Sequence, residues 1–279
     1  MKFEHSFLLE ETKEVLSRAY SKAEEIIDRD AIKPEIYDGV GEEEFDRDFH
    51  YLEEREKEIE ENHKATGTEE SARYAVVLEA LMHEAGQKSQ WFGEKAKTIK
   101  TSRIDDIRAG VDEVVSIENS KDSLSHFGLA IDVTYKESPR SKFASIKREI
   151  QSGRLASVKY FTENKGEKMH ALNDLPRFVV GADIGTVTEL VDMWLRDDEK
   201  GLREHPIQYQ ILEELLRQSL VFQKFAIKMN QKAIADKYQK AAQIIQEIVV
   251  QKQRKIRDTK NRDSVYKSIV EELSHFDEI

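Results

Sequence analysis

The sequence contains no cysteine among its 279 residues. Disulfides, thiolate zinc sites and cysteine nucleophiles are therefore excluded, and the absence fits a reducing cytosol. No apolar run approaches the roughly 20 residues that a membrane-spanning helix requires. Residues 1–14 lack the apolar stretch of a signal peptide. We therefore expect a cytoplasmic protein that does not associate with membranes.

Several common catalytic motifs are also missing. There is no Walker loop, no Gly-x-Gly-x-x-Gly fingerprint and no nucleophile elbow. Histidines at positions 83, 126, 170 and 205 are scattered and lack the spacing of metal ligands, so we interpret them as surface residues or satisfied caps.

Charge is distributed unevenly. Charged residues make up 35% of the chain and the net charge is −11, which fits a soluble, helix-rich protein. Residues 1–62 hold 21 acids and 9 bases, whereas residues 224–262 hold 11 bases and 3 acids. Such asymmetry indicates an acidic partner for the basic end, with nucleic acid the first candidate. The alternative is an ordinary solvated helical face.

Hydrophobic periodicity predicts an α/β protein. Helical spacing covers 1–30, 42–63 and 71–86, followed by strand-like segments at 97–101, 111–117 and 129–136, a helix from Pro139 to Gly153, strands at 155–161 and 177–182, and a helix after them. From position 207 onward only helices are expected, over 207–260 and 264–276. This order predicts a mixed sheet covered by helices.

We divide the chain into three predicted regions. Residues 1–66 form an acidic helical extension, residues 67–200 an α/β core, and residues 201–279 a helical C-terminal extension. The helical extensions are candidates for homo-oligomer contacts.

Two strand-like segments each carry an aspartate among apolar residues. Asp112 begins one and Asp132 lies within the next. A buried carboxylate costs several kcal/mol in practice unless it is paired or bound to a metal. Asp132, Thr134 and Lys136 alternate, so their side chains share one side of the strand. Two acids and a lysine suit the binding of Mg²⁺ or Mn²⁺ beside a phosphodiester.

A third carboxylate is expected from the helix at 71–86. Glu79 is the first candidate, Glu84 the second and Glu94 the third. Glu79 and Glu84 are separated by about 500° of helical rotation, so both cannot face one site.

The helix with Glu79, the strand with Gly110-Val111-Asp112, the strand with Asp132-x-Thr134-x-Lys136, and the helix and strand that follow resemble the PD-(D/E)xK, or restriction-endonuclease-like, nuclease superfamily. The likeness spans about residues 70–185. Residues 102–112, together with 130–134, also resemble a set of bacterial proteins placed near that superfamily.

The resemblance implies a restriction-endonuclease-like mixed sheet flanked by helices and a metal-dependent nuclease, acting on DNA. It implies that Asp112, Asp132 and Glu79 hold Mg²⁺ or Mn²⁺. The lysine of the family motif falls on Thr134, and Lys136, one pleat further on the same face, is expected to substitute for it.

Other interpretations remain open. Without the motif lysine, the core is a catalytically inactive nuclease-like scaffold that acts through helical protein–protein contacts, or a purely structural core in a helical interaction protein. Asp112 then caps a turn and Lys136 is solvated. Asp105 and Asp106 either orient the site or, as we favour, lie in a solvated loop.

The basic run at 252–257 follows the apolar segment 244–250. This segment either clamps nucleic acid or pairs with the acidic N-terminal helices of the same chain or of a second copy. We favour pairing because the opposite charges are already present in the protein.

Overall fold

The computed structural model describes residues 2–34, 41–118, 124–132, 139–164, 167–253 and 262–276. Its first half contains α1 (Lys2–Asp30), α2 (Glu42–Thr66), α3 (Glu69–Lys88), β1 (Ala96–Lys100), α4 (Arg103–Ala109), β2 (Glu113–Glu118), β3 (Leu124–Asp132) and α5 (Arg140–Ser152). Its second half contains β4 (Ala156–Phe161), β5 (His170–Leu175), β6 (Arg177–Gly181), α6 (Ile184–Leu195), α7 (Glu199–Glu204), α8 (Ile207–Lys228), α9 (Lys232–Gln253) and α10 (Ser264–Ser274).

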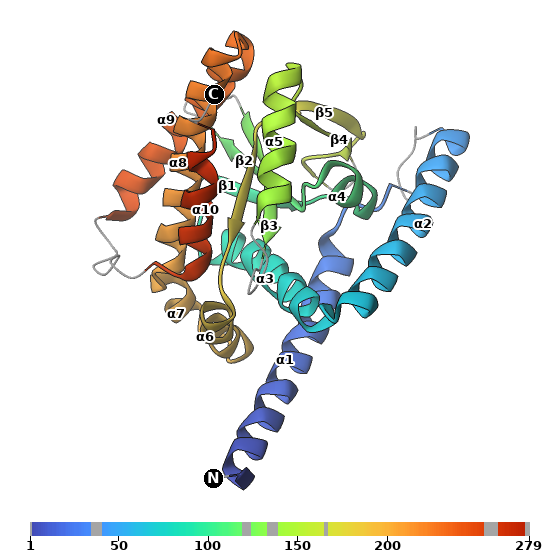
Figure 1. Cartoon of the computed structure of the whole chain (residues 1–279), viewed down its shortest axis with the longest axis vertical. Coiled ribbons are helices and arrows are strands. Elements are labelled where there is room, and N and C mark those ends of the chain that lie inside the picture. The colour runs from blue at the N-terminus through green and yellow to red at the C-terminus, as the bar shows by residue number, and fades with distance from the viewer. Residues whose placement is uncertain are drawn as a thin grey trace.

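A four-stranded mixed sheet forms the centre of the molecule, as the sequence predicts (Figure 1). Its strand order is β1-β2-β3-β6. β2 runs antiparallel to both β1 and β3, whereas β6 runs parallel to β3. Parallel neighbours need a long crossover connection, and the segment from β3 to β6 contains α5 and the β4–β5 pair.

The strand predicted at 155–161 exists as β4, but it does not join the main sheet. It pairs with β5 in a separate two-stranded sheet. Asp105 of α4 accepts hydrogen bonds from the backbone N–H groups of Lys159 at 2.7 Å and Tyr160 at 2.9 Å, so a carboxylate satisfies these β4 donors. β5 was not predicted, because most of its residues are exposed and its apolar alternation is weak.

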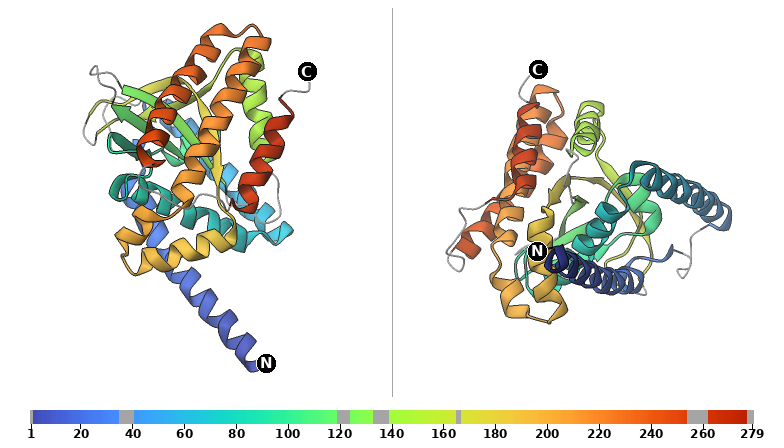
Figure 2. Two further views of the ribbon diagram at one scale, coloured as in Figure 1. Left: turned by 90° about the vertical axis from the view of Figure 1, so that its left-hand side faces the viewer. Right: turned by 60° about the horizontal axis from the view of Figure 1, so that its bottom comes forward.

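Helices pack on the sheet from both ends of the chain. α2 lies on one side of the molecule and the α8–α9 hairpin on the other, while the first half of α1 projects away (Figures 1 and 2). α1, α3, α8, α9 and α10 all contribute buried residues to one hydrophobic cluster. Within the described ranges, no helix has the length and apolar character needed to cross a bilayer.

α3 lies unusually close to β1. A Cβ atom added at Gly86 would come within 2.6 Å of the Thr98 Cγ2 atom, closer than real side chains pack. The Thr98 hydroxyl also donates to the His83 carbonyl at 3.0 Å. The small residue at position 86 therefore sets how deeply α3 sits on the sheet.

The acidic helix α2 is held against the core by Asp48. Its carboxylate pairs with Arg108 at 2.7 Å and Lys159 at 2.6 Å, and accepts from the Tyr160 hydroxyl at 2.8 Å. Glu56 of the same helix pairs with Arg103 at 3.0 Å. These α2 acids thus pair with bases of the central region, whereas residues 254–257 of the basic run that we favoured as their partner lie outside the described residues.

Replacing Asp48 tests this docking. Burial alone raises the pKa of Asp48, but hydrogen bonds from Arg108, Lys159 and Tyr160 outweigh burial and lower the pKa to about 2. The contribution of the Asp48 carboxylate to the free energy of unfolding is therefore complete above the usual pKa of 3.8 and is lost as the pH falls toward 2. Asp48→Asn should lower the free energy of unfolding by about 1–3 kcal/mol at neutral pH.

Urea denaturation from neutral pH to about pH 3 measures this difference, which should narrow below about pH 4. Asp46→Asn, an exposed aspartate on the same helix, is the control and should cost little at any pH. If the difference in unfolding free energy between the native protein and Asp48→Asn stays constant as the pH falls, the role assigned to the Asp48 carboxylate is wrong.

Candidate functional site

Charged side chains gather where the end of β1 meets α3 and the α4–β2 turn. Glu79 comes from the middle of α3, and Lys100 is the last residue of β1. Asp106 belongs to α4, and Asp112 immediately precedes β2. We call these four residues and Arg103 of α4 the acid cluster.

The Lys100 ammonium is the centre of the acid cluster. Its side chain is 3% exposed and forms an ion pair with Glu79. It also donates to the Asp112 backbone carbonyl at 2.6 Å. Burial lowers the pKa of Lys100, but the charges of Glu79, Glu113 and Asp112 outweigh burial and leave the pKa above its usual value. The lysine is therefore positively charged at neutral pH.

The turn from α4 to β2 carries the two aspartates. Gly110 ends α4 with φ of 61°, a conformation that favours glycine. The Arg177 guanidinium of β6 donates to the carbonyls of Ala109 at 2.9 Å and Gly110 at 3.2 Å. A side chain at position 110 would collide with that guanidinium. The turn is thus fixed to the far strand of the sheet.

Asp106 and Asp112 are hydrogen-bonded to each other through their side chains. Burial, followed by the negative charge of Asp112, raises the pKa of Asp106 well above its usual value, although Arg103 opposes the shift. Burial also raises the pKa of Glu79, with Asp112 adding to the shift and Lys100 opposing it. The acid cluster therefore holds more negative charge than its two bases neutralise, and Asp106 retains a proton more readily than an exposed aspartate.

A buried pair formed by His83 and Glu113 lies beside the acid cluster. The His83 Nδ1 atom of α3 is 2.6 Å from Glu113 Oε1 of β2, and both side chains are almost fully buried. The Glu113 Oε2 atom is buried without a hydrogen-bond partner in the described part of the chain. The interpretation of His83 as a surface residue or cap was therefore wrong, because its helix lies closer to the sheet than periodicity alone reveals.

Asp105 differs from its predicted environment as well. It is 1% exposed and binds Ser102 at 2.8 Å, in addition to the two β4 amides. The segment that we favoured as a solvated loop is helix α4 with Ser102 as its N-cap. Asp105 fixes α4 to β4, whereas its neighbour Asp106 faces the acid cluster.

Two of the four predicted site residues, Glu79 and Asp112, thus belong to one cluster. The structure describes only the backbone of Asp132, which pairs with Gly181. In the strand register, Lys100 of β1 lies opposite Glu113 of β2, and Glu113 lies opposite Leu129 of β3. The backbone of Asp132 therefore lies at the same end of the sheet as the acid cluster. Thr134 and Lys136 lie outside the described residues.

The other glutamates considered from sequence lie elsewhere. Glu84 pairs with Lys88 at 2.7 Å and accepts from the Trp194 indole at 2.6 Å. Glu94 is exposed and precedes β1, at the opposite end of that strand from Lys100. Lys100 itself was missed. The signal that could have found it is a lysine that ends an apolar strand facing the helix of Glu79.

A cleft of about 500 Å³ opens over the acid cluster. Its floor contains Glu79, Lys100, Arg103 and Asp106. Its walls come from the end of α1 and from the aromatic face of α2. The cluster is thus reachable from outside although its lysine is buried.

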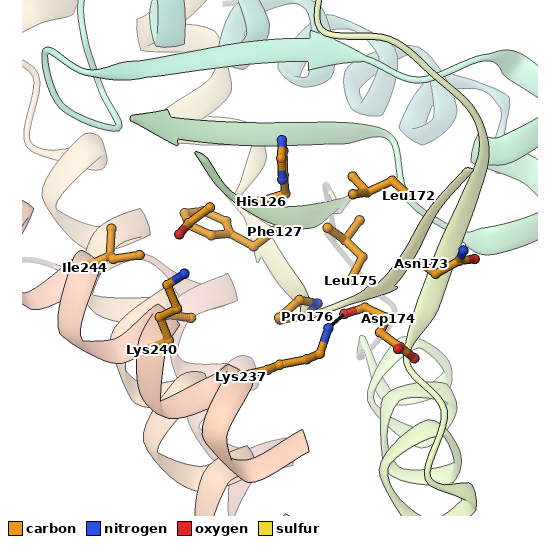
Figure 3. A pocket seen from close by; sticks show the side chains of 12 residues that line it. His126, Phe127, Leu172, Asn173, Asp174, Leu175, Pro176, Lys237, Lys240 and Ile244 are labelled. Atoms are coloured by element: carbon orange, nitrogen blue, oxygen red, sulfur yellow. Dashed lines mark hydrogen bonds between the residues drawn. The ribbon is translucent and has the colours of Figure 1, made fainter. Parts of the chain in front are cut away.

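A second cavity of about 180 Å³ lies near the opposite end of β3, between β5 and α9 (Figure 3). Lys237 and Lys240 of α9 line it together with His126, and Lys237 donates to the Asp174 carbonyl at 2.8 Å. Its lysines suit an anion, but no carboxylate cluster of the kind found at Lys100 accompanies them among its lining residues.

In the described part of the chain, no group of three or more Asp, Glu or His side chains is arranged so that it could hold a metal ion. Comparison with known proteins adds no assignment, since the chain matches no protein-family model, no curated protein and no solved structure. The chemistry of the acid cluster is therefore argued from its geometry.

The Lys100–Glu79 pair can be tested by a double-mutant cycle. Lys100→Met leaves Glu79 buried without its cation and should cost about 3–5 kcal/mol of unfolding free energy. Adding Glu79→Gln should recover part of that loss, because the uncompensated charge is removed. Lys88→Met, which breaks the more exposed Glu84 pair on the same helix, should cost less than about 1 kcal/mol. Strictly additive effects in the cycle would show that the two residues do not interact.

Asp106→Asn tests the shared proton. Because the pKa of Asp106 is raised in the folded state, the folded protein binds more protons than the unfolded chain once the pH exceeds 3.8. The free energy of unfolding therefore falls as the pH rises from 3.8 toward the raised pKa. Relative to the native protein, Asp106→Asn should therefore gain stability as the pH rises above about 4, by about 1.4 kcal/mol per unit of pKa difference. Thermal denaturation across this range measures the gain, and a pH-independent difference would contradict it.

Proposed function

We propose that the protein is a metal-dependent phosphodiesterase that cleaves nucleic acid, with DNA as the first candidate substrate. The observation that carries the proposal is the placement of the charges of Glu79, Asp106 and Asp112 around the buried, positively charged Lys100, with Glu79, Asp106 and Lys100 lining an open cleft. Carboxylates beside a fixed cation are the groups that phosphodiester hydrolysis requires.

The arrangement of the sheet supports the proposal. α3, β2, β3 and α5 occur in the order that the PD-(D/E)xK resemblance implies, with β1 and α4 inserted after α3, whereas β4, the strand that follows α5, does not join the main sheet. In that resemblance, acids come from the start of one strand and from the next strand. Here Asp112 precedes β2, and the backbone of Asp132 ends the described part of β3.

The donor set suits a divalent cation. Mg²⁺ and Mn²⁺ prefer oxygen ligands, and Mg²⁺ is usually held by one or two carboxylates with water and phosphate completing its coordination. Asp106 and Asp112 are close enough to share a hydrogen bond, and burial together with their mutual repulsion raises the pKa of Asp106. A dication would relieve that repulsion in place of the proton. Asp106 and Asp112, with Asp132 from β3, would hold the metal.

The bound metal would lower the pKa of a water and neutralise charge on the phosphate. Hydrolysis adds water to phosphorus and breaks the bond to the leaving oxygen, which takes up a proton. Lys100 has three N–H donors, two of which bind Glu79 and the Asp112 carbonyl. The third can donate to a phosphate oxygen as negative charge develops. Glu79 positions Lys100, in place of the metal-ligand role that the resemblance implies.

Cleavage of labelled single-stranded, linear duplex and supercoiled DNA, and of RNA, tests the proposal. The native protein should cleave at least one substrate with Mg²⁺ or Mn²⁺ and none with EDTA. Asp112→Asn, Asp132→Asn and Lys100→Met should each lose roughly 100-fold or more of the activity. Glu84→Gln, a glutamate of the same helix outside the acid cluster, should retain it.

Lys136→Met separates the two candidate lysines. If Lys100 supplies the catalytic cation, Lys136→Met cleaves at a near-native rate, whereas a loss equal to that of Lys100→Met assigns Lys136 a matching role. Absence of metal-dependent cleavage, or full activity in Asp112→Asn, would overturn the proposal.

A nuclease-like scaffold without activity is the second candidate. Two observations favour it: Lys100 is already paired with Glu79, and Thr134 stands at the lysine position of the family motif. A scaffold of this kind needs no metal, so Mn²⁺ would leave its melting temperature unchanged. An active metal site would raise the melting temperature, because a ligand that binds only the folded state stabilises it.

A further inference from the structure

The cleft above the acid cluster has an aromatic wall. Phe45 and Phe49 of α2 stack on each other with ring centroids 6.0 Å apart and an interplanar angle of 30°. Both rings line the cleft, as does Leu52 one turn further along α2. The same cleft is also lined by Glu79 and Lys100.

Phe49 is exposed to a degree that core packing does not explain. Its neighbours on the inner face of α2, Asp48 and Leu52, are 6% and 9% exposed, whereas Phe49 is 46% exposed. Phe49 lines a cavity that has room for a ligand, since sites for small molecules commonly measure about 300–1,000 Å³. A large aromatic ring beside a polar floor is suited to stacking against a planar group.

The charges around the cleft limit what can approach it. α2 carries 11 acids and 4 bases, so its outer surface repels a polyanion. Duplex DNA presents a dense array of phosphates and keeps its bases stacked inside. Within the cleft, ion pairs offset part of the charge: Glu56 with Arg103, Asp28 with Lys33, and Glu79 with Lys100. A single nucleotide, with one phosphate, therefore meets less repulsion there than a polyanionic duplex does.

Resting on the proposed function, we propose that this cleft receives one unpaired base of a single-stranded nucleic acid, which stacks on Phe49 and places the adjoining phosphate over Lys100. The substrate class is then a single strand, or the unpaired end of a duplex. Stacking on an aromatic ring is tolerant of sequence, because every base has a π face. α2 selects this class by excluding a fully paired helix from the floor of the cleft.

Binding can be measured apart from cleavage. Fluorescence anisotropy with the full-length Asp112→Asn variant and Ca²⁺ should show tighter binding of a labelled single-stranded oligonucleotide than of the blunt duplex of the same sequence. Phe49→Ala in that background should weaken single-strand binding roughly 10-fold, and Phe49→Trp should restore it. Ile227→Ala, which removes a 60% exposed apolar side chain of α8, should leave binding unchanged. DNA and RNA oligonucleotides form parallel arms.

The outcomes separate this inference from the proposed function. Preference for the blunt duplex, equal binding by Phe49→Ala, or no binding of either strand form would overturn the stacking site, even if the native protein cleaves DNA. Single-strand binding that depends on Phe49, together with no cleavage under any metal, would support the stacking site and refute catalysis. In an active enzyme, Phe49→Ala should raise KM more than it lowers kcat.

Discussion

The rest of the site depends on the ion pair and the hydrogen bond that the buried Lys100 ammonium makes. It joins α3 through Glu79 and the start of β2 through the Asp112 carbonyl, from its own position at the end of β1. Removing a buried lysine from water is costly unless its partners are well placed. The close approach of α3 at Gly86 and the fixed turn at Gly110 bring those partners to it. The acid cluster and the packing of the sheet are therefore one structure, and the same contacts that stabilise the fold assemble the proposed catalytic groups.

Local patterns predicted most of the elements but few of their contacts. The helix that begins at Pro139 and ends at Gly153 follows from its apolar spacing and its glycine stop, and α5 has those limits within one residue at each end. The mixed sheet likewise follows from the order of strands and helices. β4 illustrates the limit: its own residues favour a strand, but it pairs with β5 outside the main sheet, and two of its amides donate to Asp105, more than 50 residues earlier. A contact with a residue so far away in the sequence produces no pattern within the strand itself.

The candidate site shows the same division. Glu79 and Asp112 were predicted because each is an acid at a distinctive place in a local pattern. Lys100, Asp106 and the His83–Glu113 pair were not, because their roles arise only when α3, β1 and α4 meet. A lysine that ends a strand usually extends into water, and only the depth of α3 on the sheet makes this one buried. The resemblance to nucleases directed attention to Lys136, whereas the structure places a different lysine among the acids.

The most direct test of the account is to locate Mn²⁺ by anomalous scattering in crystals of the full-length protein. A metal-dependent phosphodiesterase built on the acid cluster predicts a peak at oxygen-ligand distances, about 2.0–2.6 Å, from the carboxylates of Asp112 and Asp106. It also predicts that the hydrogen bond between these two side chains is lost when the ion binds. No peak at saturating Mn²⁺, or a peak elsewhere with Asp106 and Asp112 still hydrogen-bonded, would contradict it.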